Sequence, residues 1–472
     1  MMQPKVSVII PAYNQAEYLG AAIESILAQT YSNFELIIVN DASPDHTDAV
    51  VKSFNDPRIM YIIHPKNKHL AASRNTGMRA STGQIIMLLD ADDLFHPEKL
   101  ARHVDFLQQN PDIGVTYNSR IEIDAAGQFL SFWKPKLEVD LSDLVMSFPF
   151  SPSDMVLRRE WAFEVDLFDE SYTHFSEDLD INCRLALAGC KFAGIDRPLN
   201  YRRYHPNRLI KQASERCAAA IRAQEKAFAA PDCPAEVRAL RPIALAKTYM
   251  LWSYEAFIVE QTAIGQEMLQ QAAQLDSTIF AQNGYTFLEF LVFRSTQDGS
   301  EHEPFLRAVF NQLPAQLHWL KQYQVQTIAN GYLKRGTQAA FQEQPENASY
   351  YFTKAKELGV KIDEAFLRLL ADQLLMYEAE FGDKKAQMAL QNLSDNLILI
   401  NSNQTIVRWL HGCYAINQAF KYYDERNYSK VPSRIIHAIS KDPHYLKNYG
   451  VLAAFVRSLV NSMRSPGHAI NT

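Results

Sequence analysis

The chain has 472 residues, which exceeds the size of one ordinary domain and predicts two or three. Its composition, 47% hydrophobic and 21% charged, is that of a globular protein and excludes the disordered and fibrous classes. The formal net charge of −6 gives no overall positive field, so we expect no nucleic-acid partner. Five cysteines without CxxC spacing indicate neither a disulfide framework nor a zinc site.

The N-terminal sequence MMQPKVSVIIPAYN continues as a strand pattern and is not expected to be a signal peptide. No run of the sequence reaches the ~18–20 apolar residues of a spanning helix, so we expect no transmembrane segment. These observations favour a cytoplasmic protein and leave open a peripheral association with the inner face of the membrane.

The first half of the chain alternates short apolar runs with amphipathic segments, which predicts an α/β domain with a mostly parallel sheet. The strands are expected at residues 6–10, 34–39, 59–63, 85–88, 115–123, 153–158, 191–195 and 199–204. The helices between them are expected at residues 17–29, 47–54, 70–80, 97–109, 160–168 and 178–188.

The most informative stretch is QIIMLLDADD, residues 84–93, in which a buried strand ends at three carboxylates. Asp90 and Asp92 are two apart, so their side chains point the same way in an extended backbone. Two hard oxygen ligands suit Mg²⁺ or Mn²⁺, with a substrate phosphate filling other positions. The alternative is that Asp92 or Asp93 caps the helix that Pro97 opens.

Other polar residues directly follow predicted strands, namely Tyr13 with Asn14, and Asp41. The carboxyl ends of parallel strands meet at one edge of a sheet, where α/β proteins bind nucleotides. No GxGxxG or GxxxxGK[ST] motif is present, so a classical dinucleotide site or P-loop is not supported. Asp41 could accept hydrogen bonds from a base or ribose, or merely form an Asx turn.

Acidic residues also open the helix expected at residues 178–188, where Ser176 is a candidate N-cap. Glu177 and Asp178 in its first turn could simply complement the helix dipole. Alternatively, one of them is a general base that takes a proton from an acceptor hydroxyl. Further along, His205 and Arg208 end the module, and His205 is either a surface histidine or a ligand.

Five motifs in order over residues 5–190 resemble the family 2 glycosyltransferases of GT-A fold: VSVIIPAYN, VNDASPD, AASRNTG, MLLDADD and SEDLDINCRLALAG. The resemblance covers somewhat under half of the chain. It implies an inverting transferase domain over residues 1–213 that uses a nucleotide-diphosphate sugar, with a UDP-sugar favoured, and a divalent cation, Mn²⁺ or Mg²⁺.

The resemblance also implies roles for individual residues. Asp178 matches the catalytic base, and Glu177 is the first acid of the same motif. The residues implied for the cation are Asp90, Asp92 and, more weakly, His205. The residues implied for the nucleotide are Pro11, Tyr13, Asn14, Asp41, Arg74, Asn75 and Asp90.

Beyond residue 213 helical periodicity dominates, which predicts a helical linker at 214–234 and an all-α, repeat-like domain at 235–472. Three segments resemble the second helix of a tetratricopeptide-type hairpin: residues 268–275, 348–358 and 431–442. Aligned on Ala272, Ala355 and Ala438 they are 83 residues apart, longer than two repeats of ~34 residues. The helical domain is either a plain core or a surface for an acceptor or a protein partner.

Two other function classes remain as alternatives to the enzyme. The transferase fold could have lapsed and the helical half could act as a binding scaffold, although every acidic motif position is present. A sugar-phosphate nucleotidyltransferase would need a glycine-rich loop with arginine after the first strand, where this chain has Pro11-Ala-Tyr-Asn. The acceptor, whether saccharide, lipid-linked or protein, stays open.

Overall fold

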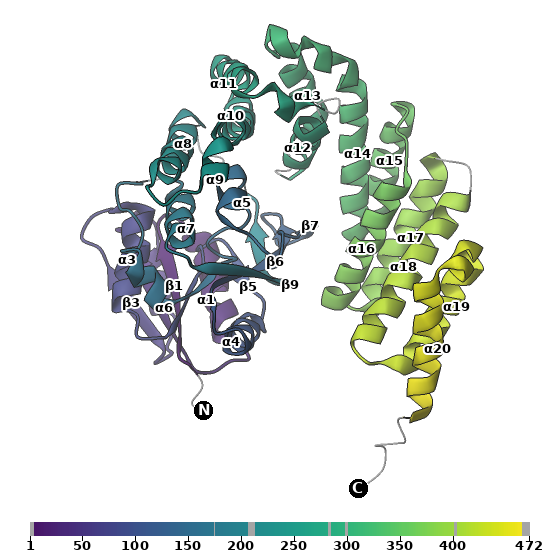
Figure 1. Cartoon of the computed structure of the whole chain (residues 1–472), viewed down its shortest axis with the longest axis horizontal. Helices are drawn as coiled ribbons and strands as arrows, with labels where there is room; N and C mark the ends of the chain where they lie inside the picture. The colour runs from purple at the N-terminus through teal and green to yellow at the C-terminus, as the bar shows by residue number, and fades with distance from the viewer. Residues whose placement is uncertain are drawn as a thin grey trace. The chain divides into compact units, whose positions relative to one another are not determined.

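The computed structural model describes residues 4–173, 175–205, 213–281, 285–297, 301–400 and 404–464. Arg208, one of the residues discussed above, lies outside this described part. By its internal contacts the chain divides into two compact units, Met1–Gln322 and Tyr323–Thr472, which run from purple to yellow in Figure 1. The predicted domain boundaries at residues 213 and 234 remain predictions, and this division by contacts comes later in the chain.

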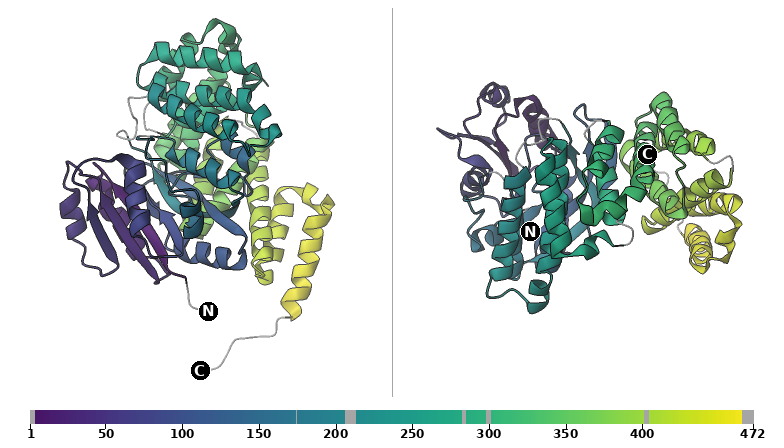
Figure 2. Two further views of the ribbon diagram at one scale, coloured as in Figure 1. Left: turned by 60° about the vertical axis from the view of Figure 1, so that its left-hand side comes forward. Right: turned by 90° about the horizontal axis from the view of Figure 1, so that it is seen from above.

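The first unit begins with four parallel strands in the sheet order β3-β2-β1-β4. They are β1 (Val6–Ala12), β2 (Phe34–Asn40), β3 (Ile59–Ile63) and β4 (Ile85–Leu88). The helices that connect them are α1 (Ala16–Leu27), α2 (Thr47–Lys52) and α3 (His69–Ala80). Figure 2 shows this part of the sheet with its helices in purple and blue. The predicted α/β alternation is thereby confirmed.

Strand β1 has apolar side chains buried on both faces, as expected for the centre of a parallel sheet. Ile9 belongs to a core cluster that includes residues of α3, whereas Val8 and Ile10 belong to the opposite cluster, formed with α1. This alternation fixes which residues point to each face. The parallel direction of β1, β2 and β4 brings the polar residues after these strands to one edge.

The sheet continues as β8 (Val156–Arg158), β6 (Ile113–Ile123), β9 (Lys191–Arg203) and β5 (Leu94–Phe95), and β7 (Phe129–Trp133) pairs with β6. The β6–β9 pair is parallel, while β8, β5 and β7 run antiparallel to their neighbours. The sequence predicted two strands where β9 is one, because the irregular pairing with β6 near Ser119 bridges the interruption around Pro198.

Helices on this part of the sheet are α4 (Lys99–Gln109), α5 (Leu141–Met146), α6 (Arg159–Glu164) and α7 (Glu177–Leu187). The expectation that Pro97 stands in the first turn of α4 is wrong, because the helix begins at Lys99 with Glu98 as its N-cap residue. Helix α5 was not predicted, although Asp140 forms a capping box with Asp143 at its start.

The first unit ends in helices that follow the sheet. They are α8 (Ala213–Ala229), α9 (Ala235–Ala239), α10 (Arg241–Ile258), α11 (Thr262–Leu275), α12 (Tyr285–Ser295) and α13 (His302–Asn311), with the 3-10 helices η2 (Ser277–Phe280) and η4 (Ala315–Tyr323). Trp252, Tyr254 and Phe257 of α10 are buried, which fits a role as core aromatics.

The second unit is entirely helical in its described residues. It contains α14 (Gln324–Phe341), α15 (Pro345–Glu357), α16 (Glu364–Phe381), α17 (Asp383–Ile400), α18 (Gln404–Asp424), α19 (Val431–Lys441) and α20 (Tyr449–Arg464), with η5 (Tyr428–Lys430) and η6 (Pro443–Lys447). A helical region after the α/β domain is therefore confirmed. Ala272, Ala355 and Ala438 are all fully buried, but the tetratricopeptide relationship remains a prediction.

Within the described ranges, no helix has both the length and the apolar character that crossing a bilayer requires. The five cysteines are all buried free thiols.

Candidate active site

Strands β1, β2 and β4 end at the same edge of the sheet, and predicted site residues follow them. β1 and β2 remain in register up to Ala12 and Asn40. Beyond them, the backbone N–H of Asn14 donates a hydrogen bond to Oγ of Ser43 at 2.8 Å. The ring of Tyr13 is 47% exposed, so one of its faces is accessible to a ligand. Pro11 is buried within β1.

The acidic turn after β4 brings three carboxylates together. Oxygen atoms of Asp90, Asp92 and Asp93 lie within 4.8 Å of one another. The backbone N–H of Arg203 donates to Oδ1 of Asp93 at 3.0 Å, and Nε2 of His205 lies 3.0 Å from Oδ2 of Asp92. The end of β9 therefore holds this turn. His205 is buried against Asp92, which excludes the surface-histidine alternative.

Arg74 joins the acidic turn to the start of α7. Its guanidinium is fully buried, with Nη2 2.7 Å from Oδ1 of Asp90 and Nη1 bonded to Oε1 of Glu177. Burial alone would lower the pKa of Arg74, but the carboxylates of Asp90 and Glu177 outweigh it and raise that pKa above its ordinary value. A buried arginine between two carboxylates needs both of them, because each unpaired buried charge is costly.

Glu177 and Asp178 occupy the first turn of α7. Burial raises the pKa of Glu177 to about 7, against the opposing charge of Arg74. Burial also raises the pKa of Asp178, opposed by Arg74 and by the N–H of Leu179, which donates to Oδ1 of Asp178 at 2.8 Å. Raised carboxyl pKa values beside an arginine are typical of groups that accept protons near neutral pH.

Ser176 is the N-cap residue of α7, as its position suggested, but it does not cap in the expected way. Its φ is +67°, and its side chain makes no capping hydrogen bond. A left-handed backbone at a serine is sparsely populated, and such conformations are concentrated at functional sites. The backbone C=O of Ser176 instead accepts the N–H of Asp180 at 3.1 Å.

Asp41 is more constrained than either interpretation of the sequence supposed. It is 3% exposed, and its Oδ1 lies 2.7 Å from Nδ1 of His64 and accepts the N–H of Lys68 at 2.8 Å. The other ring nitrogen of His64 lies 2.9 Å from Oγ1 of Thr76. Sequence reasoning missed His64, although it directly follows β3 just as Asp41 follows β2.

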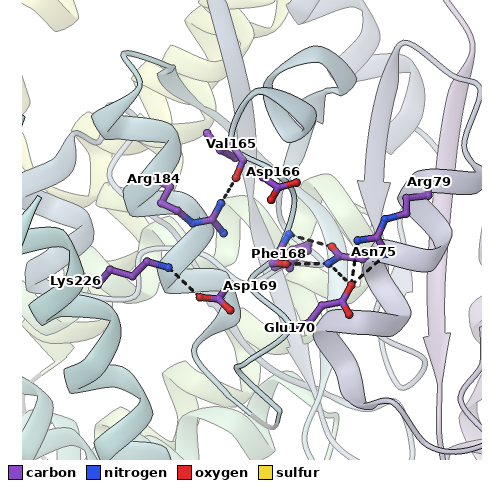
Figure 3. A pocket seen from close by; sticks show the side chains of 9 residues that line it. All are labelled: Asn75, Arg79, Val165, Asp166, Phe168, Asp169, Glu170, Arg184 and Lys226. Atoms are coloured by element: carbon purple, nitrogen blue, oxygen red, sulfur yellow. Dashed lines mark hydrogen bonds and ion pairs between the residues drawn. The ribbon is translucent and has the colours of Figure 1, made fainter.

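Asn75 points away from its neighbour Arg74, into the loop before α7. Its Nδ2 donates to the backbone oxygen of Phe168 at 2.8 Å, and its Oδ1 accepts the N–H of Phe168 at 3.0 Å. Figure 3 shows these bonds beside a pocket of about 400 Å³. The pocket is lined by Asn75, Arg79, Val165, Asp166, Phe168, Asp169, Glu170, Arg184 and Lys226. In the structure Asn75 is thus engaged with this loop, and a nucleotide contact remains only a prediction.

The same loop is held from α7. Arg184 donates through Nη1 to the backbone oxygen of Val165 and through Nη2 to that of Leu167 at 2.8 Å. Asp166 and Leu167 both have positive φ, +56° and +61°. Helices α3 and α7 therefore both form side-chain hydrogen bonds with this loop. The loop thus helps to keep Arg74 of α3 close to Glu177 of α7.

A buried polar layer lies behind the acidic turn. The backbone N–H of Asp90 donates to Oγ of Ser153 at 3.1 Å, and Nζ of Lys99 donates to the backbone oxygen of Ser153 at 3.0 Å. Burial lowers the pKa of Lys99 to about 7, partly offset by the charge of Asp154. Nothing in the sequence distinguishes Lys99 from an ordinary helix residue or Ser153 from an ordinary turn residue.

Comparison with known proteins bears on this site. Residues 7–161 match the family model described as glycosyl transferase family 2. An uncharacterised glycosyltransferase of Rickettsia typhi is 35% identical over 182 residues, which is 36% of this chain and 56% of the relative. One of Nostoc is 37% identical over 166 residues, 33% of this chain and 51% of the relative. The chain thus spans about half the length of these two relatives.

Solved structures also match at low identity. Staphylococcus aureus TarS, crystallised as residues 1–349 in complex with UDP, is 19% identical over 70% of this chain and 91% of that chain, with a TM-score of 0.43. A mannosyltransferase of Pyrobaculum calidifontis, in complex with GDP-Man and Mn²⁺, is 18% identical over 69% and 88%, with a TM-score of 0.42. The family assignment rests on the sequence matches. Residues 7–161 of this chain are a family 2 glycosyltransferase domain.

Proposed function

We propose that this chain is an inverting glycosyltransferase that moves a sugar from a nucleoside-diphosphate donor to an acceptor hydroxyl. The observation that carries the proposal is the buried bridge of Arg74 between Asp90 of the acidic turn and Glu177 of α7. This bridge joins Asp90, one of the expected cation ligands, to Glu177, the neighbour of the expected base Asp178, from segments almost ninety residues apart. A lapsed enzyme would have no need to keep so many buried charges together.

The acidic turn fits a divalent cation. Its three carboxylates offer hard oxygen atoms within 4.8 Å of one another, the donor type that Mg²⁺ and Mn²⁺ prefer. Asp90 and Asp92 would hold the cation, and His205 would orient Asp92 from behind. A divalent cation bound there supplies positive charge that stabilises the diphosphate leaving group.

Asp178 is the proposed general base. The acceptor oxygen attacks the anomeric carbon as the bond to the diphosphate oxygen breaks, and the hydroxyl proton passes to the Asp178 carboxylate. A single displacement of this kind inverts the anomeric centre. Burial raises the pKa of Asp178, which makes its carboxylate a stronger base than an exposed aspartate.

The nucleotide is expected at the neighbouring strand ends. Tyr13 offers an exposed ring for a base, and Asn14 lies beside it. Asp41 would have to contact a ribose or base while its carboxylate keeps the hydrogen bonds to His64 and to the N–H of Lys68. Arg74 would contribute indirectly, because its guanidinium holds the side chains of Asp90 and Glu177 in place. A UDP-sugar is the favoured donor.

Release of nucleoside diphosphate from UDP-, GDP-, dTDP- and CDP-sugars, with Mn²⁺ or Mg²⁺ and with candidate acceptors, tests this proposal. We expect turnover of one donor class. Asp178→Asn should lower turnover by about 10²–10⁴-fold and leave nucleotide affinity nearly unchanged. The matched control is Asp166→Asn. Asp166 is exposed and has a left-handed backbone conformation, which asparagine also tolerates. Wild-type turnover in Asp178→Asn would refute the base assignment.

A further inference from the structure

The last helix of the second unit, α20, presents an apolar face to solvent. The exposed fractions are 89% for Tyr449, 57% for Val456, 41% for Val460 and 36% for Leu459. Their spacings of three, four and seven residues place them on one side of the helix. An exposed apolar stripe of this length on a helix marks an interaction surface.

The opposite side of α20 already faces the protein. Val451, Ala454 and Ser458 are buried there, and the first two pack in one core cluster with Ile435 and Ala438 of α19. Both sides of α20 are thus apolar, and the outer side carries the larger side chains.

Two neighbouring elements also have exposed apolar side chains. Ile436 of α19 is 58% exposed and Leu446 of η6 is 52% exposed. Helices α19 and α20 lie side by side near the C-terminal end of the unit (Figure 1, yellow). We refer to the following set as the α20 surface: Tyr449, Val456, Leu459 and Val460.

The segment that contains α19, η6 and α20 is positively charged, whereas the whole chain is negatively charged. Residues 426–464 contain seven lysines and arginines and one acid, Asp442, whereas the chain as a whole has a net charge of −6. The sequence of α20 contains no acidic residue. Two of the basic residues are exposed beside the stripe, Lys447 just before Tyr449 and Arg457 next to Val456.

We propose that the α20 surface docks on an anionic lipid surface. The apolar stripe would enter the boundary between head groups and acyl chains, and the basic residues would contact the anionic head groups. A second copy of the chain fits this surface less well, because it would bring two segments of the same positive charge together. The inference uses residues of the second unit only and does not depend on the proposed function.

Vesicle co-sedimentation of the full chain tests the proposal. We expect binding to phosphatidylcholine vesicles that contain phosphatidylglycerol, weaker binding to phosphatidylcholine alone, and a loss of binding as salt is raised. Val456→Asp should lower binding about tenfold or more, and Arg457→Glu about fivefold or more. The control is Leu369→Asp on α16, where the native side chain is 53% exposed, and it should bind like the wild type.

Circular dichroism melting shows whether Val456→Asp is folded, and exposed Arg457 provides a second variant that leaves the packed side untouched. Absence of binding to the anionic vesicles would overturn the proposal, and so would wild-type binding by both variants. If the wild type instead forms a dimer in analytical ultracentrifugation that Val456→Asp abolishes, and binds no vesicles, the surface belongs to a second copy and the lipid proposal is wrong.

Discussion

Arg74 is the residue on which the geometry of the site depends, because its guanidinium pairs with two carboxylates from distant segments. Arg74→Met should therefore leave Glu177 buried without its positive partner and Asp90 without its ion pair. We expect the free energy of unfolding of the first unit to fall by about 3–5 kcal/mol in urea denaturation.

The control for this prediction is Arg79→Met, one and a half turns along the same helix. Arg79 is 58% exposed and pairs with Glu170 at the surface, so its loss should cost less than about 1 kcal/mol. Equal effects of the two substitutions would mean that the bridge of Arg74 contributes nothing beyond an ordinary surface pair.

The carboxyl groups of Glu177 and Asp178, in the first turn of α7, predict that turnover depends on pH. Asp178 must be ionised to accept a proton, and burial raises its pKa above the ordinary aspartate value. Lowering the pH through the raised pKa values of Asp178 and of Glu177, the latter about 7, should therefore reduce turnover. The measurement is the rate of nucleoside-diphosphate release at saturating donor and cation. Turnover that is constant or increases as the pH falls would contradict Asp178 as the base.

For individual residues, the sequence predicts the chemistry of a side chain better than it predicts which residues that side chain contacts. The position of Asp90 and Asp92 after a strand predicted a common edge, and the structure brings their carboxylates together. The bonds of Asp41 to His64 and of Arg74 to Glu177 could not be predicted, because they join segments whose distance depends on the whole fold. Asn75 was expected near the nucleotide, but in the structure it secures Phe168.

At the level of secondary structure, the loop at residues 165–170 is hydrogen-bonded by side chains of α3 and α7, the two helices that carry Arg74 and Glu177. Asn75→Leu would remove the hydrogen bonds that hold Phe168, leave its backbone groups unsatisfied, and cost about 1–3 kcal/mol. We expect faster hydrogen exchange at the Phe168 amide, measured by mass spectrometry of peptides from this loop.

The matched control is Asn55→Leu at an exposed position after α2. It should leave exchange at Phe168 unchanged. Slow exchange in Asn75→Leu together with weaker nucleotide binding would favour the predicted nucleotide contact over a role in holding the loop.

The strands and helices of the sheet were predictable because their apolar periodicity is strong, as in β1 and α1. Helix α5 escaped prediction although the residues of its capping box, Asp140 and Asp143, stand in the sequence. The continuity of β9 through Pro198 also escaped prediction, because it depends on pairing with β6 rather than on local sequence.

At the scale of the whole molecule, all of the proposed site residues belong to the first unit, Met1–Gln322. A chain that ends at Gln322 should therefore bind nucleotide in the presence of Mn²⁺ about as tightly as the full chain, within roughly twofold, which is about 0.4 kcal/mol. Calorimetry on the truncated and full-length proteins would check this. A loss of binding in a folded truncated protein would show that the second unit contributes to the nucleotide site.

The proposed function requires that the acidic turn and the neighbouring strand ends bind a nucleotide with a divalent cation. Calorimetric titration with UDP, GDP, dTDP and CDP, each with and without Mn²⁺, tests it most directly. We expect cation-dependent binding of one nucleotide, with UDP favoured, and a loss of that binding in Asp92→Ala. Absence of binding to all four by a folded protein, or binding that is unchanged in Asp92→Ala, would contradict it.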